Sequence, residues 1–159
     1  MNRSQALRRL EDWFASKGWR SLPFQRAMWR HYLAGGSGLL HTPTGSGKTL
    51  AFGLPLLQGL NAASDRVQGL VLVPTRELAT QVSAALLGGA EALGLRLLTL
   101  CGGVAQEQQQ AELALGPQLL VATPGRLRDL LAQRRLGLSN LRTLVLDEAD
   151  RLLEMGFWP

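Results

Sequence analysis

Short apolar runs alternate with segments of helical spacing along most of the chain. The apolar runs occupy residues 38–41, 69–73, 95–100, 118–122 and 143–147. The segments with helical spacing occupy residues 47–60, 76–92, 104–115 and 125–135. Strands that are apolar on both faces and separated by helices are typical of a buried parallel sheet. The pattern therefore predicts an α/β fold, a mainly parallel sheet flanked by helices on both faces.

The first 36 residues follow a different, purely helical pattern. In residues 4–17 the side chains of Leu7, Leu10 and Phe14 fall on one side of a helix. A second helix is expected from Pro23 to Ala34, where two glycines follow. We therefore expect an N-terminal helical segment over residues 1–36 and the α/β part over residues 37–159.

Length and composition limit the class of protein. A chain of 159 residues with 46% apolar and 18% charged residues suits one globular domain. No apolar run approaches the length of a membrane span, and the polar N-terminus does not resemble a signal peptide. The single cysteine, Cys101, cannot form an internal disulfide. These features predict a soluble, cytoplasmic protein.

The excess of basic residues is only weak evidence for a nucleic-acid partner. Seventeen basic and twelve acidic residues give a net charge of +5 and a pI near 10.6. A basic balance suits a polyanionic partner such as nucleic acid. Almost all of the basic residues are arginines, so genome composition is an equally good explanation.

The stretch HTPTGSGKTL, residues 41–50, has the character of a phosphate-binding loop between a strand and a helix. Its glycines let backbone N–H groups point at one anion, Lys48 can reach the β- and γ-phosphates, and the Thr49 hydroxyl can ligate Mg²⁺. The strict pattern requires a glycine where Thr42 stands. The alternative is an ordinary helix start with flexible glycines. The predicted nucleotide-binding residues are Thr44, Gly45, Ser46, Gly47, Lys48 and Thr49.

Two carboxylates at the end of the last predicted strand complete this chemistry. Asp147 can hold Mg²⁺, and Glu148 can orient and deprotonate an attacking water. The alternative is that these acids only begin a solvated helix. We predict that Lys48, Asp147 and Glu148 are catalytic and that Thr49 and Asp147 bind the metal.

Five motifs in this order resemble the DEAD-box ATP-dependent RNA helicases. Asp147-Glu148-Ala149-Asp150 is the motif that names the family, and the phosphate loop precedes it. The remaining three are similar to motif Ia, the glycine doublet and motif Ib, and they comprise Pro74-Thr75-Arg76-Glu77-Leu78, Gly102-Gly103 and Thr123-Pro124-Gly125-Arg126.

The resemblance implies a RecA-like P-loop NTPase domain that uses ATP and Mg²⁺ and binds RNA. It also implies that these three motifs hold the sugar–phosphate backbone of the strand, without reading its bases. The residues concerned are Pro74, Thr75, Arg76, Gly102, Gly103, Thr123, Pro124, Gly125 and Arg126. An upstream segment of the family reads adenine, and here Gln25 and Trp19 stand in its place.

That upstream segment departs from the family pattern. GWRSLPFQ, residues 18–25, is one residue short and lacks the first proline, and it resembles related superfamily 2 helicases that act on DNA. Two alternatives to an RNA helicase lobe therefore stay open. One is a DNA-directed helicase or translocase lobe, and the other is a non-catalytic fragment that binds nucleic acid by charge.

The family resemblance also implies parts that do not occur in these 159 residues. A Ser-Ala-Thr motif on a further strand follows in the family, and a second RecA-like domain supplies arginines to the γ-phosphate. We expect the further strand between those that carry Lys48 and Asp147, so the sheet is expected to be incomplete at its C-terminal end. An arginine finger contributes about 10³–10⁵ in rate, so we expect very low ATPase activity and no unwinding by this chain alone.

Overall fold

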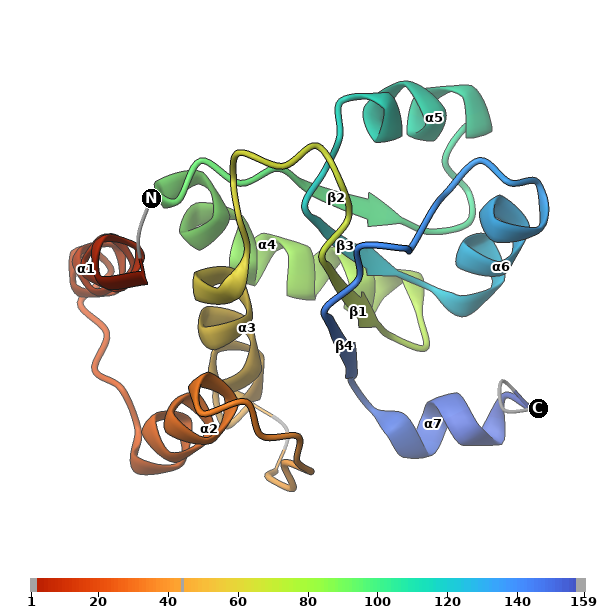
Figure 1. Ribbon diagram of the computed structural model, residues 1–159. Coiled ribbons are helices and arrows are strands. Elements are labelled where there is room, and N and C mark those ends of the chain that lie inside the picture. The colour runs from red at the N-terminus through yellow and green to blue at the C-terminus, as the bar shows by residue number, and fades with distance from the viewer. Residues whose placement is uncertain (1–2, 44, 157–159) are drawn as a thin grey trace.

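The computed structural model describes residues 3–43 and 45–156, in which helices and strands alternate after two initial helices (Figure 1). The helices are α1 (Arg3–Ser16), α2 (Pro23–Leu33), α3 (Lys48–Gly59), α4 (Arg76–Ala92), α5 (Gln106–Ala114), α6 (Pro124–Ala132) and α7 (Ala149–Glu154). The strands are β1 (Gly69–Leu72), β2 (Leu97–Leu100), β3 (Leu119–Ala122) and β4 (Thr143–Leu146). Within the described ranges, none of the helices has the length and hydropathy that a bilayer span requires.

The four strands form one parallel sheet in the order β2-β3-β1-β4. Gly69 of β1 is in register with Leu119 of β3 on one side and with Thr143 of β4 on the other. Strands far apart in the sequence are therefore neighbours, as the crossover helices of an α/β fold allow. The predicted fold class is confirmed.

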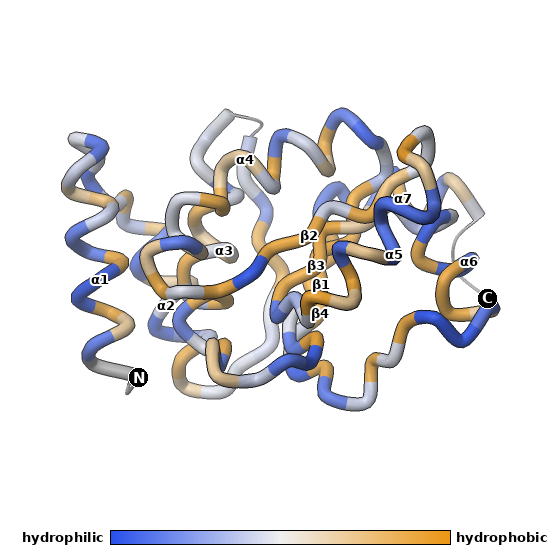
Figure 2. The backbone as a smooth tube through the Cα atoms, turned by 90° about the horizontal axis from the view of Figure 1, so that it is seen from above, coloured by the Kyte–Doolittle hydropathy of each residue, from blue (hydrophilic) through white to orange (hydrophobic). Residues whose placement is uncertain are grey.

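Helices cover the two faces of the sheet with separate apolar clusters. On one face, Val71 and Val121 pack in a cluster with Leu57 of α3 and Leu86 of α4, and α1 adds an outer layer to the same cluster. On the other face, Leu120 packs in a cluster that includes Leu127 and Leu130 of α6 and is bordered by α5. Figure 2 shows the strands as a hydrophobic band in the middle of the molecule.

The predicted strand at residues 38–41 is wrong. These residues have no regular secondary structure, and Leu39 is 88% exposed. A strand requires a hydrogen-bonded neighbour, and β4 pairs only with β1 among the described residues. Without that neighbour, the apolar run at 38–41 remains an irregular connection to the phosphate loop.

The outer edge of β4 is open in the described part of the chain. Leu144 and Leu146 are 52% and 37% exposed, because no helix of the described part covers that face of the strand. An open edge with exposed leucines is unusual for a finished sheet. The additional strand expected between residues 38–41 and β4 would pair this edge, and it stays a prediction.

The N-terminal helices pack closely onto the α/β part. The indole of Trp13 lies over Gly88 of α4, where a Cβ atom would come within 2.5 Å of Trp13 Nε1. The hydroxyl of Tyr32 in α2 hydrogen-bonds the Thr143 hydroxyl at the start of β4, at 2.6 Å. The first contact joins α1 to α4, and the second joins α2, which lies just before the phosphate loop, to the sheet.

The contact between α3 and α4 generates a first prediction. A Cβ at Gly53 of α3 would overlap the side chain of Leu86, which is fully buried in α4 and has no room to turn away. Gly53→Ala should therefore lower the free energy of unfolding by about 1–3 kcal/mol, measured by urea denaturation. Gly125→Ala in α6, where the added methyl meets nothing within 4 Å, is the control and should be neutral or slightly stabilising.

Candidate functional site

The candidate site lies at the edge of the sheet where the four parallel strands end. The segments that follow β1, β2, β3 and β4 contain, in this order, Thr75, the Gly102-Gly103 doublet, Thr123 and Asp147. Parallel strands bring such segments to the same edge, which is where α/β folds bind ligands. The gathering of the motif loops at one edge is therefore a consequence of the sheet topology.

The phosphate loop has the backbone that an anion cradle requires. Gly45 and Gly47 have φ angles of 75° and 86°, which favour glycine, and Gly47 is the N-cap of α3. Lys48 and Thr49 form the first turn of α3, where free backbone N–H groups and the helix dipole attract a phosphate. Thr44 lies outside the described residues.

Two hydroxyl groups in this loop are buried without a partner. Thr42 Oγ1 and Ser46 Oγ are inaccessible to solvent and form no hydrogen bond in the described part of the chain. A buried hydroxyl without a partner costs free energy, and such groups call for an explanation. Oxygen-rich phosphates are suitable partners for both, so the loop fits a nucleotide. Thr42, the departure from the strict motif, thus adds a polar group to this loop.

Gln25 connects α2 to the phosphate loop. Its Nε2 donates to the Gly47 carbonyl at 3.0 Å, and its Oε1 accepts from the Leu22 N–H at 2.8 Å. The side chain is buried, and a Cβ on Gly47 would lie 2.8 Å from Gln25 Nε2. One amide hydrogen and one oxygen lone pair are left for a ligand. The structure thus places Gln25 beside the phosphate loop, and its reading of adenine stays a prediction.

Trp19 lies elsewhere. Its ring contacts Trp13 and Phe14 edge-on, and it lines a hollow between α1, α2 and α3. No described residue of the phosphate loop borders that hollow. The structure therefore does not bring Trp19 and Gln25 to one cavity, and stacking of adenine on Trp19 has no support in this arrangement.

Lys48 and Asp147 face each other across the site. Their Nζ and Oδ1 atoms are 4.0 Å apart, and Asp147 is only 7% exposed. Burial raises the pKa of the Asp147 carboxyl above its ordinary value of 3.8, and the Lys48 ammonium and the Glu148 N–H offset this only in part. The carboxylate is therefore not part of a solvated helix start, and it can act as a metal ligand beside the phosphate loop.

Glu148 has a strained backbone next to this carboxylate. Its φ of 51° is in the left-handed region, which is uncommon for residues other than glycine and recurs at functional sites. It is the N-cap of α7, and its Oε2 accepts a hydrogen bond from Arg151 Nη1 at 3.0 Å. The sequence analysis did not consider Arg151 as a partner of this carboxylate.

The predicted metal ligands are few, which suits Mg²⁺. Among the described residues, no group of three or more His, Cys, Asp or Glu side chains could hold a metal ion. Mg²⁺ typically takes one or two protein ligands together with substrate phosphates and waters, so Thr49 and Asp147 fit that pattern.

The three candidate nucleic-acid motifs contact one another. The guanidinium of Arg76 lies over Gly103, where a Cβ would overlap its Nη1. Arg126 donates from Nη2 to the Val104 carbonyl at 2.6 Å and from Nε to the Cys101 carbonyl at 3.4 Å. The arginines of motifs Ia and Ib therefore flank the glycine-doublet loop, and both retain N–H groups for phosphates.

Helix starts add backbone donors to this face. The Thr75 hydroxyl accepts from the Leu78 N–H at 3.2 Å and caps α4. Thr123 is the N-cap of α6, its side chain forms no cap hydrogen bond, and Pro124 follows it in the first turn. The Thr123 hydroxyl and the free N–H groups of α6, including that of Gly125, are thus available to an anionic ligand.

Gln109 is a supporting residue that the sequence analysis missed. The run QEQQQ at residues 106–110 has the composition of a solvated helix face, but Gln109 is only 1% exposed and donates from Nε2 to the Cys101 carbonyl at 3.0 Å. It therefore anchors the loop that carries the glycine doublet. Its position one helical turn before the apolar Leu113 was the available signal.

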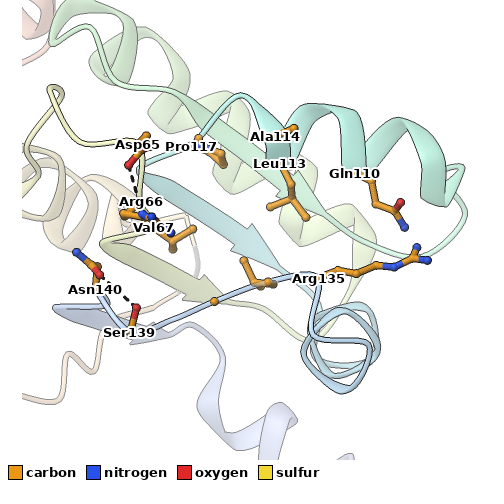
Figure 3. A pocket seen from close by; sticks show the side chains of 13 residues that line it. Asp65, Arg66, Val67, Gln110, Leu113, Ala114, Pro117, Arg135, Ser139 and Asn140 are labelled. Carbon is orange, nitrogen blue, oxygen red and sulfur yellow. Dashed lines mark hydrogen bonds and ion pairs between the residues drawn. The ribbon is translucent and has the colours of Figure 1, made fainter.

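A second hollow, of about 480 Å³, opens at the opposite edge of the sheet (Figure 3). Arg66, which pairs with Asp65 at 3.4 Å, lines it together with Arg135. None of the predicted site residues lies there, so the motif chemistry is confined to the carboxyl edge.

Comparisons with known proteins agree with this geometry. Residues 22–159 match the family model described as DEAD/DEAH box helicase. The chain is 49% identical over 136 residues to the ATP-dependent RNA helicase DbpA of Escherichia coli, and 48% identical to DeaD of the same organism. Each alignment covers 85% of this chain, but only 30% and 22% of those relatives.

Solved structures show the same fold. A hypothetical ATP-dependent RNA helicase from Sulfolobus tokodaii superposes with a TM-score of 0.85 at 30% identity, over 94% of this chain and 44% of that one. The yeast DEAD-box splicing factor Prp28 superposes with a TM-score of 0.76 at 31% identity, over 86% of this chain and 34% of that one. The chain thus spans less than half the length of these relatives.

The raised pKa of Asp147 generates a second prediction. Between pH 3.8 and the raised pKa, the folded chain binds this proton more tightly than the unfolded chain, so the free energy of unfolding falls as the pH rises. Without nucleotide and Mg²⁺, Asp147→Asn should therefore be more stable than the parent chain at neutral pH. The gain should disappear at acidic pH, where the aspartate is itself neutral.

Urea denaturation across this pH range measures the effect. Asp150→Asn removes an exposed carboxylate three residues away and is the matched control, for which we expect no such gain. An Asp147→Asn chain that is less stable than the parent at neutral pH would contradict the argument.

Proposed function

Because the chain belongs to the DEAD/DEAH box helicase family, as an N-terminal RecA-like domain, we propose that it is the ATP- and RNA-backbone-binding lobe of an ATP-dependent RNA helicase. In the complete protein this lobe couples ATP hydrolysis to the unwinding of RNA duplexes. The observation that carries the proposal is the approach of Lys48 to the buried Asp147 at the carboxyl edge of the sheet.

The nucleotide is held by the start of α3 and the loop before it. Backbone N–H groups of residues 45–49 and the side chain of Lys48 bind the β- and γ-phosphates of ATP. The Thr42 and Ser46 hydroxyls, which lack partners in the described chain, donate to the same phosphates. Gln25 positions the loop through Gly47 and offers its remaining amide hydrogen and oxygen to the adenine edge.

Thr49 and Asp147 are the residues that would hold Mg²⁺. When bound, Mg²⁺ neutralises charge on the phosphate oxygens during phosphoryl transfer. Glu148 acts as the general base that orients the attacking water and takes its proton. The hydrogen bond from Arg151 limits the directions in which this carboxylate can point.

The RNA strand is bound along the face formed by the segments after β1, β2 and β3. Arg76, Arg126 and the Thr123 hydroxyl contact phosphates, and the exposed Gly102-Gly103 turn allows the strand to approach the backbone closely. Contacts of this kind are independent of base sequence. The affinity of this lobe is expected to be on the order of 10⁻⁴–10⁻⁶ M and to fall with salt.

Unwinding requires the second RecA-like domain that the proposal places elsewhere in the complete protein. A DNA-directed lobe of the same superfamily is the principal alternative, because residues 18–25 depart from the family pattern. Stimulation of the ATPase activity of the complete protein by RNA and by DNA separates the two, and the proposal requires stimulation by RNA.

The nucleotide site is tested by binding of mant-ATP to the 159-residue chain. Lys48→Ala removes a charged donor to the phosphates and should weaken binding about tenfold or more. The chain has only two lysines, so the matched control is Lys17→Ala, which removes an exposed lysine and should leave mant-ATP binding unchanged. Equal binding by the two variants would indicate a defunct nucleotide site.

The role of Glu148 is tested by Glu148→Gln in the complete protein. The amide cannot accept a proton from water, so the ATPase kcat should fall by about 10²-fold or more while ATP binding is retained. Steady-state phosphate release gives kcat, and mant-ATP binding provides the control for a folded site. An unchanged kcat would remove Glu148 from its assigned role.

A further inference from the structure

The excess positive charge of the chain is confined to its N-terminal helices. Residues 1–36 contain seven of the seventeen basic residues and two of the twelve acidic residues, so residues 37–159 contain ten of each sign. The whole net charge of +5 therefore belongs to the segment that carries none of the RNA-binding motifs. Lys17, Arg20, Arg26 and Arg30 in this segment are exposed.

This basic segment also contains an aromatic hollow of about 450 Å³ between α1, α2 and α3. Phe14, Trp19 and Trp29 line it, and Trp19 is 43% exposed. Arg20 and Arg26 border the hollow, with Glu11 as the single acidic residue. The volume is in the range of ligand pockets, roughly 300–1,000 Å³. Aromatic walls with a basic border also distinguish this hollow from a packing cavity in an apolar core.

The groups in this hollow are held in place before any ligand arrives. The Trp19 ring contacts Trp13 at 5.7 Å and Phe14 at 5.6 Å between centroids, in both cases edge-on. Arg26 Nη1 donates to the Ser21 carbonyl at 2.5 Å and to the Ser21 hydroxyl at 3.2 Å, and its Nε and Nη2 groups form no hydrogen bond within the described part of the chain. A fixed aromatic platform beside a fixed Arg26 reduces the entropy lost on binding.

We propose that this hollow is a second nucleic-acid site, which takes a single strand. A base stacks on Trp19, and Arg20 and Arg26 contact the phosphates on either side of it. Aromatic platforms with a basic border are the chemistry by which proteins hold single strands without reading sequence. A duplex offers phosphates but keeps its bases stacked, so it would use the arginines and not Trp19.

The second site is separate from the motif loops. In Figures 1 and 2, α1 and α2 lie at one end of the molecule, and α6, which carries Arg126, lies at the other. Neither the phosphate loop nor the three RNA motifs contribute a residue to the hollow. The proposal therefore goes beyond the proposed function and is independent of the nucleotide site.

The aromatic platform is tested by fluorescence anisotropy of a short labelled oligouridine with the intact 159-residue chain at low salt. Trp19→Ala should weaken binding about fivefold or more, the effect of losing one base stack. Trp19→Phe keeps an aromatic face and should retain most of the affinity. Thermal unfolding of both variants checks that they are folded. Equal affinities of the Ala and Phe variants would overturn the proposal.

The arginine border is tested by a charge reversal and a matched control. Arg20→Glu should weaken binding and lower the dependence of log K on log salt by about 0.7 per lost phosphate contact. Arg142→Glu makes the same charge change at an exposed arginine before β4, outside both sites, and should have a much smaller effect. Equal losses of affinity in the two variants would show that RNA binding depends only on the net charge of the chain, and the proposal would fail.

Arg76→Ala distinguishes RNA binding at this hollow from RNA binding at the motif loops. If both sites bind RNA independently, Trp19→Ala and Arg76→Ala each lower the amount of RNA bound, and the double variant binds less than either single variant. If Arg76→Ala alone weakens binding, the second site is refuted while the proposed function stands. If Trp19→Ala alone does so, the second site stands and the RNA face of the proposed function fails.

Discussion

A buried carboxylate beside a single lysine is the constraint on which this structure depends. Asp147 is 7% exposed at the end of β4, its pKa is raised by burial, and the Lys48 ammonium is 4.0 Å from it. A pair at this distance, without a direct hydrogen bond, does not recover the cost of removing both charges from water. The fold gains little from keeping Asp147 ionised, whereas a site for a cation and a polyphosphate requires that charge. The strained φ of Glu148 lies around the same point, as do the Thr42 and Ser46 hydroxyls, which have no hydrogen-bond partner among the residues that the structure describes. Several energetically unfavourable features therefore occur close together. Such clustering is typical of functional sites, because the rest of a natural fold avoids these features.

Long side chains from neighbouring helices hold the loops around that point. Gln25 connects α2 to Gly47, Gln109 connects α5 to Cys101, and Arg126 connects α6 to Val104. In each case a long side chain from a helix donates a hydrogen bond to a backbone carbonyl of the loop. The phosphate loop and the glycine-doublet loop are thus positioned by neighbouring helices, so the relative placement of the nucleotide and nucleic-acid faces depends on helix packing.

Much of this arrangement could be predicted from the sequence because parallel strands and motif loops follow local rules. The pattern of apolar positions predicted all four strands of the described sheet, one further strand at 38–41 that does not form, and the six helices before α7. The motif residues followed the strands as expected. Interactions between distant segments could not be predicted. The run at 38–41 has the composition of a strand, but pairing requires a neighbour that the described part of the chain does not supply. Gln109 lies in a run of polar residues, and only the packing of α5 shows that it faces the core. Trp19 and Gln25 were predicted to bind adenine together because both stand in the segment that resembles the family's adenine-reading motif, yet Trp19 lines the hollow and Gln25 contacts the phosphate loop.

The open edge of β4 exposes apolar side chains, whereas the basic N-terminal helices expose charged ones. Leu144, Leu146 and Leu39 are apolar and exposed, so their neighbourhood suits further polypeptide and is a poor surface to leave in water. Arg20 and Arg26 are charged and exposed beside an aromatic hollow, so their neighbourhood is compatible with water and still able to bind a polyanion.

Tyr32 connects the two regions through its hydrogen bond to Thr143, because α2 carries one end of the hollow and also contacts the first residue of β4. The single helix α2 thus carries Gln25 beside the phosphate loop, one wall of the hollow and the contact with β4.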